Sequence, residues 1–167
     1  MLGESAVMNA LNEEMNELGR KRRVREILDA AVTACSTRGA RLTPIRTRVF
    51  ELIAEAERPI KAYELLANLR QERRAEPPTV YRAIDFLMRQ GLIHRVAAKS
   101  AFVISRRPGD VHPKPFLVCE RCGGVTELAN ELMDQILEGE ASARGFRTTS
   151  RTIEVQGICA SCRMPHS

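Results

Sequence analysis

The chain has 167 residues, which is long enough for one medium domain or for two small ones that each bury a core. Its formal net charge is +5, with 26 Lys and Arg against 21 Asp and Glu, and this excess favours a polyanionic partner. No apolar run is long enough to span a bilayer and no secretory signal is recognisable, so we expect a cytoplasmic protein without a membrane partner.

The first part of the chain predicts two helical segments of unequal strength. Residues 1–19 carry a few apolar residues at helical spacing, but the segment is polar and Gly19 interrupts it. We therefore expect a weak helix or a frayed arm, and assign residues 1–23 to an N-terminal arm. Residues 20–38 form a clearer amphipathic stripe, on which Cys35 is a core residue rather than a reactive thiol.

Three more helices follow, each with a start signal or a break. A Thr-Pro pair begins a helix over residues 43–57, in which the threonine can cap the N-terminus, and a second helix covers residues 62–74. Two prolines and a threonine at residues 77–79 begin the third, and Gly91 ends it. Its apolar residues recur at helical spacing and predict a buried stripe.

Two strand-like runs, at residues 92–96 and 101–105, predict a β-hairpin directly after the third helix. Three short helices followed by a hairpin have the order of a winged helix, which we assign to residues 24–105. With the apolar stripe facing inward, the exposed first turn of the third helix offers Tyr81 and Arg82 to DNA. On this stretch alone, an ordinary amphipathic helix with a solvated polar face is the alternative.

Two further basic residues lie near helix starts, where phosphates are commonly bound. Arg46 follows the start of the first of these three helices, and Lys61 precedes the second. We expect both to contact the DNA backbone and not the bases.

Residues 106–111 have no periodicity and two chain breakers, which is typical of a linker. The remaining residues, 112–167, predict a small α/β unit. Its expected elements are strands at 116–119 and 125–128, a helix capped by Asn130 that runs to about Arg144, and a strand at 152–158. The apolar residues of that helix are expected to form its buried face: Leu132, Met133, Ile136 and Leu137. The fold class is therefore α+β.

Five cysteines, an odd number, argue against a disulfide framework and for a thiolate metal site with one thiol left over. Four of them form two Cys-x2-Cys pairs: Cys119, Cys122, Cys159 and Cys162. Four thiolates are the ligand set of a closed tetrahedral Zn2+ site. Two independent redox pairs are the alternative, but the thioredoxin-like context that they need is absent. Because a closed site leaves no coordination position for a substrate, we expect no enzyme activity.

Two imidazoles and a carboxylate lie around the linker: His94, His112 and Glu127. Each by itself is more often a surface residue than a metal ligand. A metal held by all three would tie the orientation of the helical half to metal occupancy.

Several of these motifs together resemble the ferric uptake regulator (Fur) family, and its zinc uptake regulators most of all. They are Thr43-Pro44-x-Arg46, the run Pro78-Thr79-Val80-Tyr81-Arg82-Ala83-Ile84-Asp85-Phe86-Leu87, His94 in the hairpin, and the two cysteine pairs. The resemblance covers about residues 24–163. It implies a homodimeric, zinc-responsive repressor of zinc uptake genes that binds double-stranded operator DNA and no small-molecule substrate, with a C-terminal dimerisation unit.

The same resemblance implies roles for individual residues. The four paired cysteines would hold a structural Zn2+, and His94, His112 and Glu127 a regulatory Zn2+. Tyr63, Tyr81 and Arg82 stand at positions that the family uses on DNA.

Two departures from the family pattern keep alternatives open. Zinc-branch members carry a cysteine ligand at the end of the hairpin, where this chain has Ser105. The regulatory site would then have three protein ligands, completed by water or by Asp110. The His-rich run of iron-branch members is also missing. A regulator with only structural zinc, or one that senses iron or manganese, is the alternative.

Overall fold

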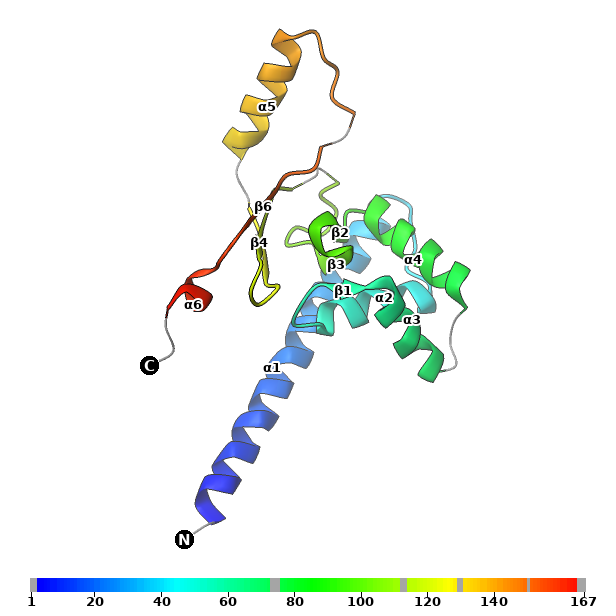
Figure 1. Ribbon diagram of the computed structural model, residues 1–167. Helices are drawn as coiled ribbons and strands as arrows, with labels where there is room; N and C mark the ends of the chain where they lie inside the picture. The colour runs from blue at the N-terminus through cyan, green and yellow to red at the C-terminus, as the bar shows by residue number, and fades with distance from the viewer. Residues whose placement is uncertain (1–2, 73–75, 112–113, 129–130, 150, 165–167) are drawn as a thin grey trace.

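The computed structural model describes residues 3–72, 76–111, 114–128, 131–149 and 151–164 (Figure 1). The helices are α1 (Gly3–Ser36), α2 (Pro44–Glu55), α3 (Ala62–Gln71), α4 (Pro77–Arg89), α5 (Glu131–Ala143) and α6 (Ala160–Arg163), with a 3-10 turn η1 (Ala97–Lys99). The strands are β1 (Ile60–Lys61), β2 (Ile93–Val96), β3 (Ala101–Ile104), β4 (Phe116–Cys119), β5 (Val125–Glu127) and β6 (Glu154–Gly157). No helix in these ranges is both long enough and apolar enough to cross a membrane.

The helical half has the predicted winged-helix order. Helices α2, α3 and α4 enclose one apolar core, and the hairpin β2–β3 follows α4, with η1 at its tip. Its largest fully buried side chains include Phe50, Leu65, Leu69, Ile84 and Leu87. The sequence did not predict β1, a two-residue strand that pairs with β3 to give the sheet order β1-β3-β2. Thr43 is the N-cap of α2 as predicted, but its side chain makes no capping hydrogen bond.

The prediction that Gly19 interrupts the first helical segment is wrong. Helix α1 runs through Gly19 without a break, and its N-terminal half projects away from the rest of the molecule (Figure 1). A single glycine costs a helix only about 1 kcal/mol, and ion pairs one turn apart lie close to it, such as Lys21–Glu17 at 2.7 Å, which spans it. The C-terminal half is held by the core, where Cys35 is 1% exposed, as predicted.

The C-terminal unit is a three-stranded sheet with one helix beyond it. Strand β4 lies in the centre, antiparallel to β5 and parallel to β6. The predicted buried face of α5 is wrong for the single chain, because the helix stands apart from its own sheet (Figure 1). Leu132 is 62% exposed and Ile136 is 56% exposed. Leu137 is also exposed, and Asn130, the expected cap, lies outside the described residues.

The two halves meet through a second, smaller apolar cluster. Val96 of β2 is fully buried together with Phe116 and Val118 of β4, and Val103 and Val125 pack against them. The hairpin is thus covered by the helical core on one side and by the C-terminal sheet on the other. The relative position of the halves depends on this cluster and on the chain between them.

That connecting chain is fixed at Gly91, which follows the end of α4. Gly91 has φ +64°, and its carbonyl accepts a hydrogen bond of 3.1 Å from the N–H of Gly109. A Cβ atom at Gly91 would lie 2.5 Å from the carbonyl oxygen of Asp110, which is too close for any side chain. Glycine is therefore required here both by the backbone conformation and by the contact with the linker.

We expect Gly91→Ala to destabilise the protein by about 1–3 kcal/mol. Alanine is unfavourable at a positive φ, and its Cβ atom would clash with the linker. Gly19→Ala is the matched control. A Cβ atom at Gly19 would have no heavy atom within 4 Å, so this variant should gain about 0.5–1 kcal/mol. Midpoints of urea unfolding, measured on zinc-loaded protein, check both. A midpoint for Gly91→Ala at or above that of the parent contradicts the assignment.

Candidate metal centres and DNA-binding surface

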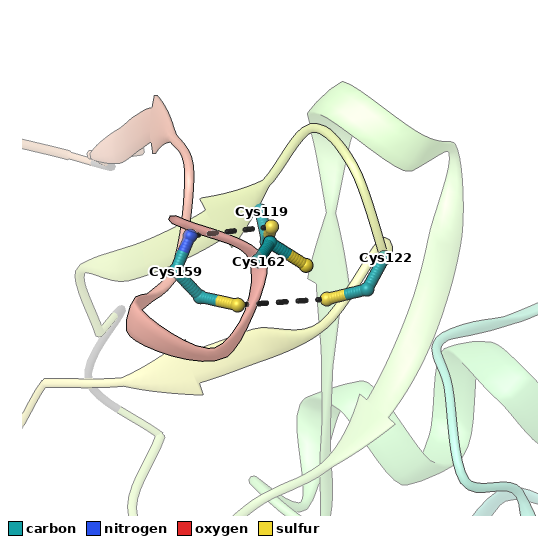
Figure 2. A group of neighbouring side chains, drawn as sticks. All are labelled: Cys119, Cys122, Cys159 and Cys162. Atoms are coloured by element: carbon teal, nitrogen blue, oxygen red, sulfur yellow. Dashed lines mark hydrogen bonds between the residues drawn. The ribbon is translucent and has the colours of Figure 1, made fainter. Parts of the chain in front are cut away.

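The four paired cysteines converge on one point (Figure 2). Cys119 is the last residue of β4 and Cys122 lies in the turn that follows, whereas Cys159 is the N-cap of α6 and Cys162 lies within that helix. Their sulfur atoms all lie within 4.8 Å of one another. Arg121 joins the two segments by donating a hydrogen bond of 2.6 Å to the carbonyl of Cys162. The structure thus brings together the residues that the spacing predicted.

The geometry fits a zinc ion. A tetrahedral site with Zn–S bonds of about 2.3 Å places neighbouring sulfurs about 3.8 Å apart. The sulfurs of Cys122 and Cys159 are 3.8 Å apart. Among the residues that the structure describes, this is the one cluster of His, Cys, Asp and Glu side chains that meets the geometry of a metal site.

The electrostatics of the cluster also suit a cation. Backbone N–H groups, of Cys159 first and then of Cys122, lower the pKa of Cys119 to about 6. The pKa of Cys162 rises to about 12, mainly through its hydrogen bond with Cys159 and then through burial and the other two cysteines. Ionising one thiol therefore makes the next harder to ionise, because the charges crowd together. A divalent cation removes this repulsion, which couples metal binding to folding of the unit.

A second group of polar side chains lies where the hairpin meets the C-terminal sheet. His94 of β2 packs its ring against Phe116 of β4, with 5.7 Å between the ring centroids. Its Nε2 atom is buried and has no hydrogen-bond partner in the part of the chain that the structure describes. Burial lowers the pKa of His94, while the carboxylates of Glu127 and Asp110 oppose this shift. A neutral imidazole with an unsatisfied nitrogen is suited to metal binding.

Glu127 and Ser105 lie at this same junction, which we call the hinge. They differ in how far their side-chain oxygens are already used by hydrogen bonds. Glu127 is 8% exposed, and one of its oxygens accepts a hydrogen bond of 3.1 Å from the N–H of Arg106. Its carboxylate is thereby oriented at the hinge. The Ser105 hydroxyl is 3.1 Å from the carbonyl of Arg107 and 3.3 Å from its N–H, so it is already used by the backbone of the linker.

The third expected ligand, His112, lies outside the described residues, so its place relative to His94 and Glu127 stays a prediction. Asp110 is close enough to His94 to influence its pKa, and it is paired with Lys114 at 2.6 Å. No motif surrounds Asp110 in the sequence, and only its position in the linker pointed to it.

The expected DNA-contacting residues lie on the outside of the helical half. Tyr81 is 56% exposed and Arg82 is exposed beside it on the first turns of α4, as the apolar stripe predicted. Tyr63 is 64% exposed at the start of α3. The Lys61 ammonium lies 5.9 Å from the centre of the Tyr63 ring, so the two side chains are neighbours at the start of α3.

Arg46 differs from the other basic candidates because its guanidinium is engaged within the protein. It stacks 3.6 Å from the centre of the Phe86 ring and donates a hydrogen bond of 2.9 Å to the carbonyl of Arg41. Its expected phosphate contact stays a prediction.

Comparison with known proteins decides the family. The model of the ferric uptake regulator family matches residues 37–156, which is most of the chain. The chain belongs to the ferric uptake regulator family. The zinc uptake regulation protein of Escherichia coli (strain K12) is 38% identical to it over 144 residues, covering 85% of this chain and 84% of that protein. The family that the motifs predicted is therefore confirmed.

Solved structures of zinc uptake regulators also resemble this chain. A zinc uptake regulator in complex with zinc and DNA is 39% identical, with a TM-score of 0.77 over 83% of this chain and 94% of that chain. Holo XcZur is 46% identical, with a TM-score of 0.78 over 82% of this chain and 96% of that chain. Apo XcZur, at 44% identity, reaches a TM-score of 0.51 over 86% and 99%. This Fur-family chain therefore resembles the holo structure more closely than the apo structure.

We expect Cys119→Ser or Cys162→Ser to lose the bound zinc and to leave the C-terminal unit unfolded or monomeric, because metal binding contributes directly to its folding. Zinc content by elemental analysis and molar mass by light scattering check this. Cys35→Ser is the control: it buries a hydroxyl in the helical core and lowers stability, but it should keep one zinc ion per chain. A dimeric Cys162→Ser protein with normal zinc content contradicts the assignment.

Proposed function

We propose that this chain is a zinc-responsive transcriptional repressor that binds operator DNA as a homodimer and controls zinc uptake genes. The observation that carries the proposal is the hinge, where Glu127 lies close enough to His94 to influence its pKa, at the contact between the hairpin and the C-terminal sheet. The likeness of the whole chain to a zinc uptake regulator complexed with zinc and DNA supports the proposal. We infer a regulator rather than an enzyme, since the closed cysteine cluster offers no position for a substrate.

The exposed apolar face of the C-terminal unit supports the homodimer. Besides the side chains of α5 described above, Phe146 is 73% exposed and Val155 is 53% exposed. Leu117 and Ile158 are also exposed on the same unit. Several large apolar side chains exposed on one small unit are typical of a protein interface. A second copy of the chain, packed through α5 and the sheet, would cover it and place two α4 helices for two DNA half-sites.

The regulatory metal would act by holding the two halves together. His94 comes from the helical half and Glu127 from the C-terminal half, and His112 follows the linker between them. An ion bound to all three prefers the closed arrangement over any open one. It can shift the population only by that difference in affinity. DNA binding then follows metal occupancy, because only closed dimers present both α4 helices at the right spacing.

The donor set at the hinge is harder than that of the cysteine cluster. Two imidazoles and a carboxylate, with Asp110 nearby, provide no thiolate, and the Ser105 hydroxyl is bound to the linker backbone. Nitrogen and oxygen donors bind zinc less tightly and discriminate less against other divalent ions. Iron and manganese are therefore the control metals for every titration, although the relatives named above are zinc uptake regulators.

His94→Ala, His112→Ala and Glu127→Ala should each abolish zinc-stimulated DNA binding, because each removes one ligand of the hinge metal. All three variants should remain dimers with one tightly held zinc per chain. A titration of operator binding against buffered free zinc checks this.

The serine supplies the matched comparison at the same site. Ser105→Cys should lower the free zinc needed for half-maximal DNA binding, since it adds a thiolate, whereas Ser105→Ala should change it little. The parent protein should not bind its operator equally well with and without zinc at the hinge. Equal binding would contradict the regulatory site and favour a regulator whose only zinc is structural.

Arg82→Ala should weaken operator binding by about 1–3 kcal/mol if the guanidinium reads a guanine from the first turns of α4. Arg89→Ala is the control, because Arg89 is exposed on the last turn of the same helix and carries the same charge. Fluorescence anisotropy with operator and with random DNA separates base recognition from charge. Equal losses for the two variants on operator DNA would show that α4 is not docked through its first turns.

A further inference from the structure

One row of side chains across the C-terminal sheet faces the hairpin at three points. In the sheet register, Phe116 of β4 is paired with Glu127 of β5 on one side and with Glu154 of β6 on the other. Residues paired across strands point to the same face of a sheet. Glu127 binds the N–H of Arg106 after the hairpin, and Phe116 contacts the ring of His94 in its middle. The third member of the row, Glu154, contacts the tip of the hairpin, which is the turn η1 between β2 and β3.

Glu154 binds the hairpin tip with both carboxylate oxygens. Its Oε1 accepts a hydrogen bond of 2.5 Å from the N–H of Ala97, and its Oε2 one of 2.7 Å from the N–H of Ala98. The ladder between β2 and β3 ends at the pair Val96 and Ala101, so it does not use these two N–H groups. They belong to the first residues of η1, whose N–H groups a helical turn leaves without an internal partner. A bidentate, charge-assisted contact of this kind is stronger than an ordinary hydrogen bond.

This contact is independent of the candidate metal site. Glu127 and His94 belong to the hinge, whereas Glu154 stands on the other side of Phe116 and binds backbone N–H groups. The hairpin is therefore held at its tip by a carboxylate whether or not an ion is present at the hinge. The small apolar cluster of Val96, Phe116 and Val118 lies between the two attachments.

We propose that Glu154 is a positioning residue that latches the hairpin tip to the C-terminal sheet and so sets the free zinc concentration at which the chain becomes competent for DNA. The proposal rests on the proposed function. The latch favours the closed arrangement before the regulatory metal binds. Because an ion that binds only the closed form has its apparent affinity reduced by the fraction of molecules that are open, the latch makes the response more sensitive to zinc.

The test compares Glu154→Ala with Glu138→Ala in the full-length dimer carrying its cysteine-bound zinc. Glu138 is an exposed glutamate of the same unit, and helical spacing places it on the side of α5 opposite to the apolar residues. Amide exchange of Ala97 and Ala98 is followed by NMR without added metal, and operator binding is then titrated against buffered zinc. In Glu154→Ala we expect both amides to exchange about tenfold faster or more, and the zinc midpoint to rise about tenfold, on the scale of one charge-assisted bond. Glu138→Ala should match the parent in both.

Glu154→Gln provides a second, less disruptive variant, because its amide keeps one acceptor oxygen of the two. It should give an intermediate zinc midpoint with unchanged zinc content and unchanged dimer mass. The latch is wrong if the amides of Ala97 and Ala98 exchange at parental rates in Glu154→Ala, or if its zinc midpoint equals that of the parent. If the DNA binding of the parent protein does not respond to zinc at all, the proposed function is wrong. The exchange rates of Ala97 and Ala98 would still show whether Glu154 binds the hairpin tip.

Discussion

The arrangement of this protein depends on the packing of one hairpin of the helical half against the C-terminal sheet. Val96 is fully buried by side chains of β4 that lie about twenty residues further along the chain. This cluster is small, so its apolar area contributes far less than the helical core, which includes parts of α1, α2, α3 and α4. A small contact between two halves suits a conformational switch, because a ligand has to change the balance by only a few kcal/mol.

The two candidate metal centres differ in the way that their roles demand. The four thiols of the first come from two segments of one unit, and they crowd together until a cation relieves their repulsion, which suits an ion that stays bound. The ligands proposed for the hinge come from both halves and include no thiolate, because residue 105 is a serine. These donors release an ion more readily than thiolates do, which suits an ion whose occupancy changes with supply.

Much of this could be predicted from local sequence, and the failures share a cause. The spacing of the cysteines, the order of helices and hairpin, and the exposed placement of Tyr81 and Arg82 depend on periodicity and turn chemistry, which are local. The apolar stripe of α5 correctly predicts a helix face, but sequence alone could not say that the single chain leaves this face uncovered. Strand β1 is too short to leave a pattern. The contact of Glu154 with the hairpin tip joins residues far apart in sequence through backbone groups, for which no motif exists.

Helix α1 affects how closely another molecule can approach one side of this protein. Its 34 residues make a rod about 50 Å long, and only the C-terminal half of that rod is fixed against the protein core. The helix is continuous through Gly19, so the projecting half extends the core-packed half instead of folding back onto the body. A molecule that packs closely against this side of the protein has to accommodate the projecting half of the rod.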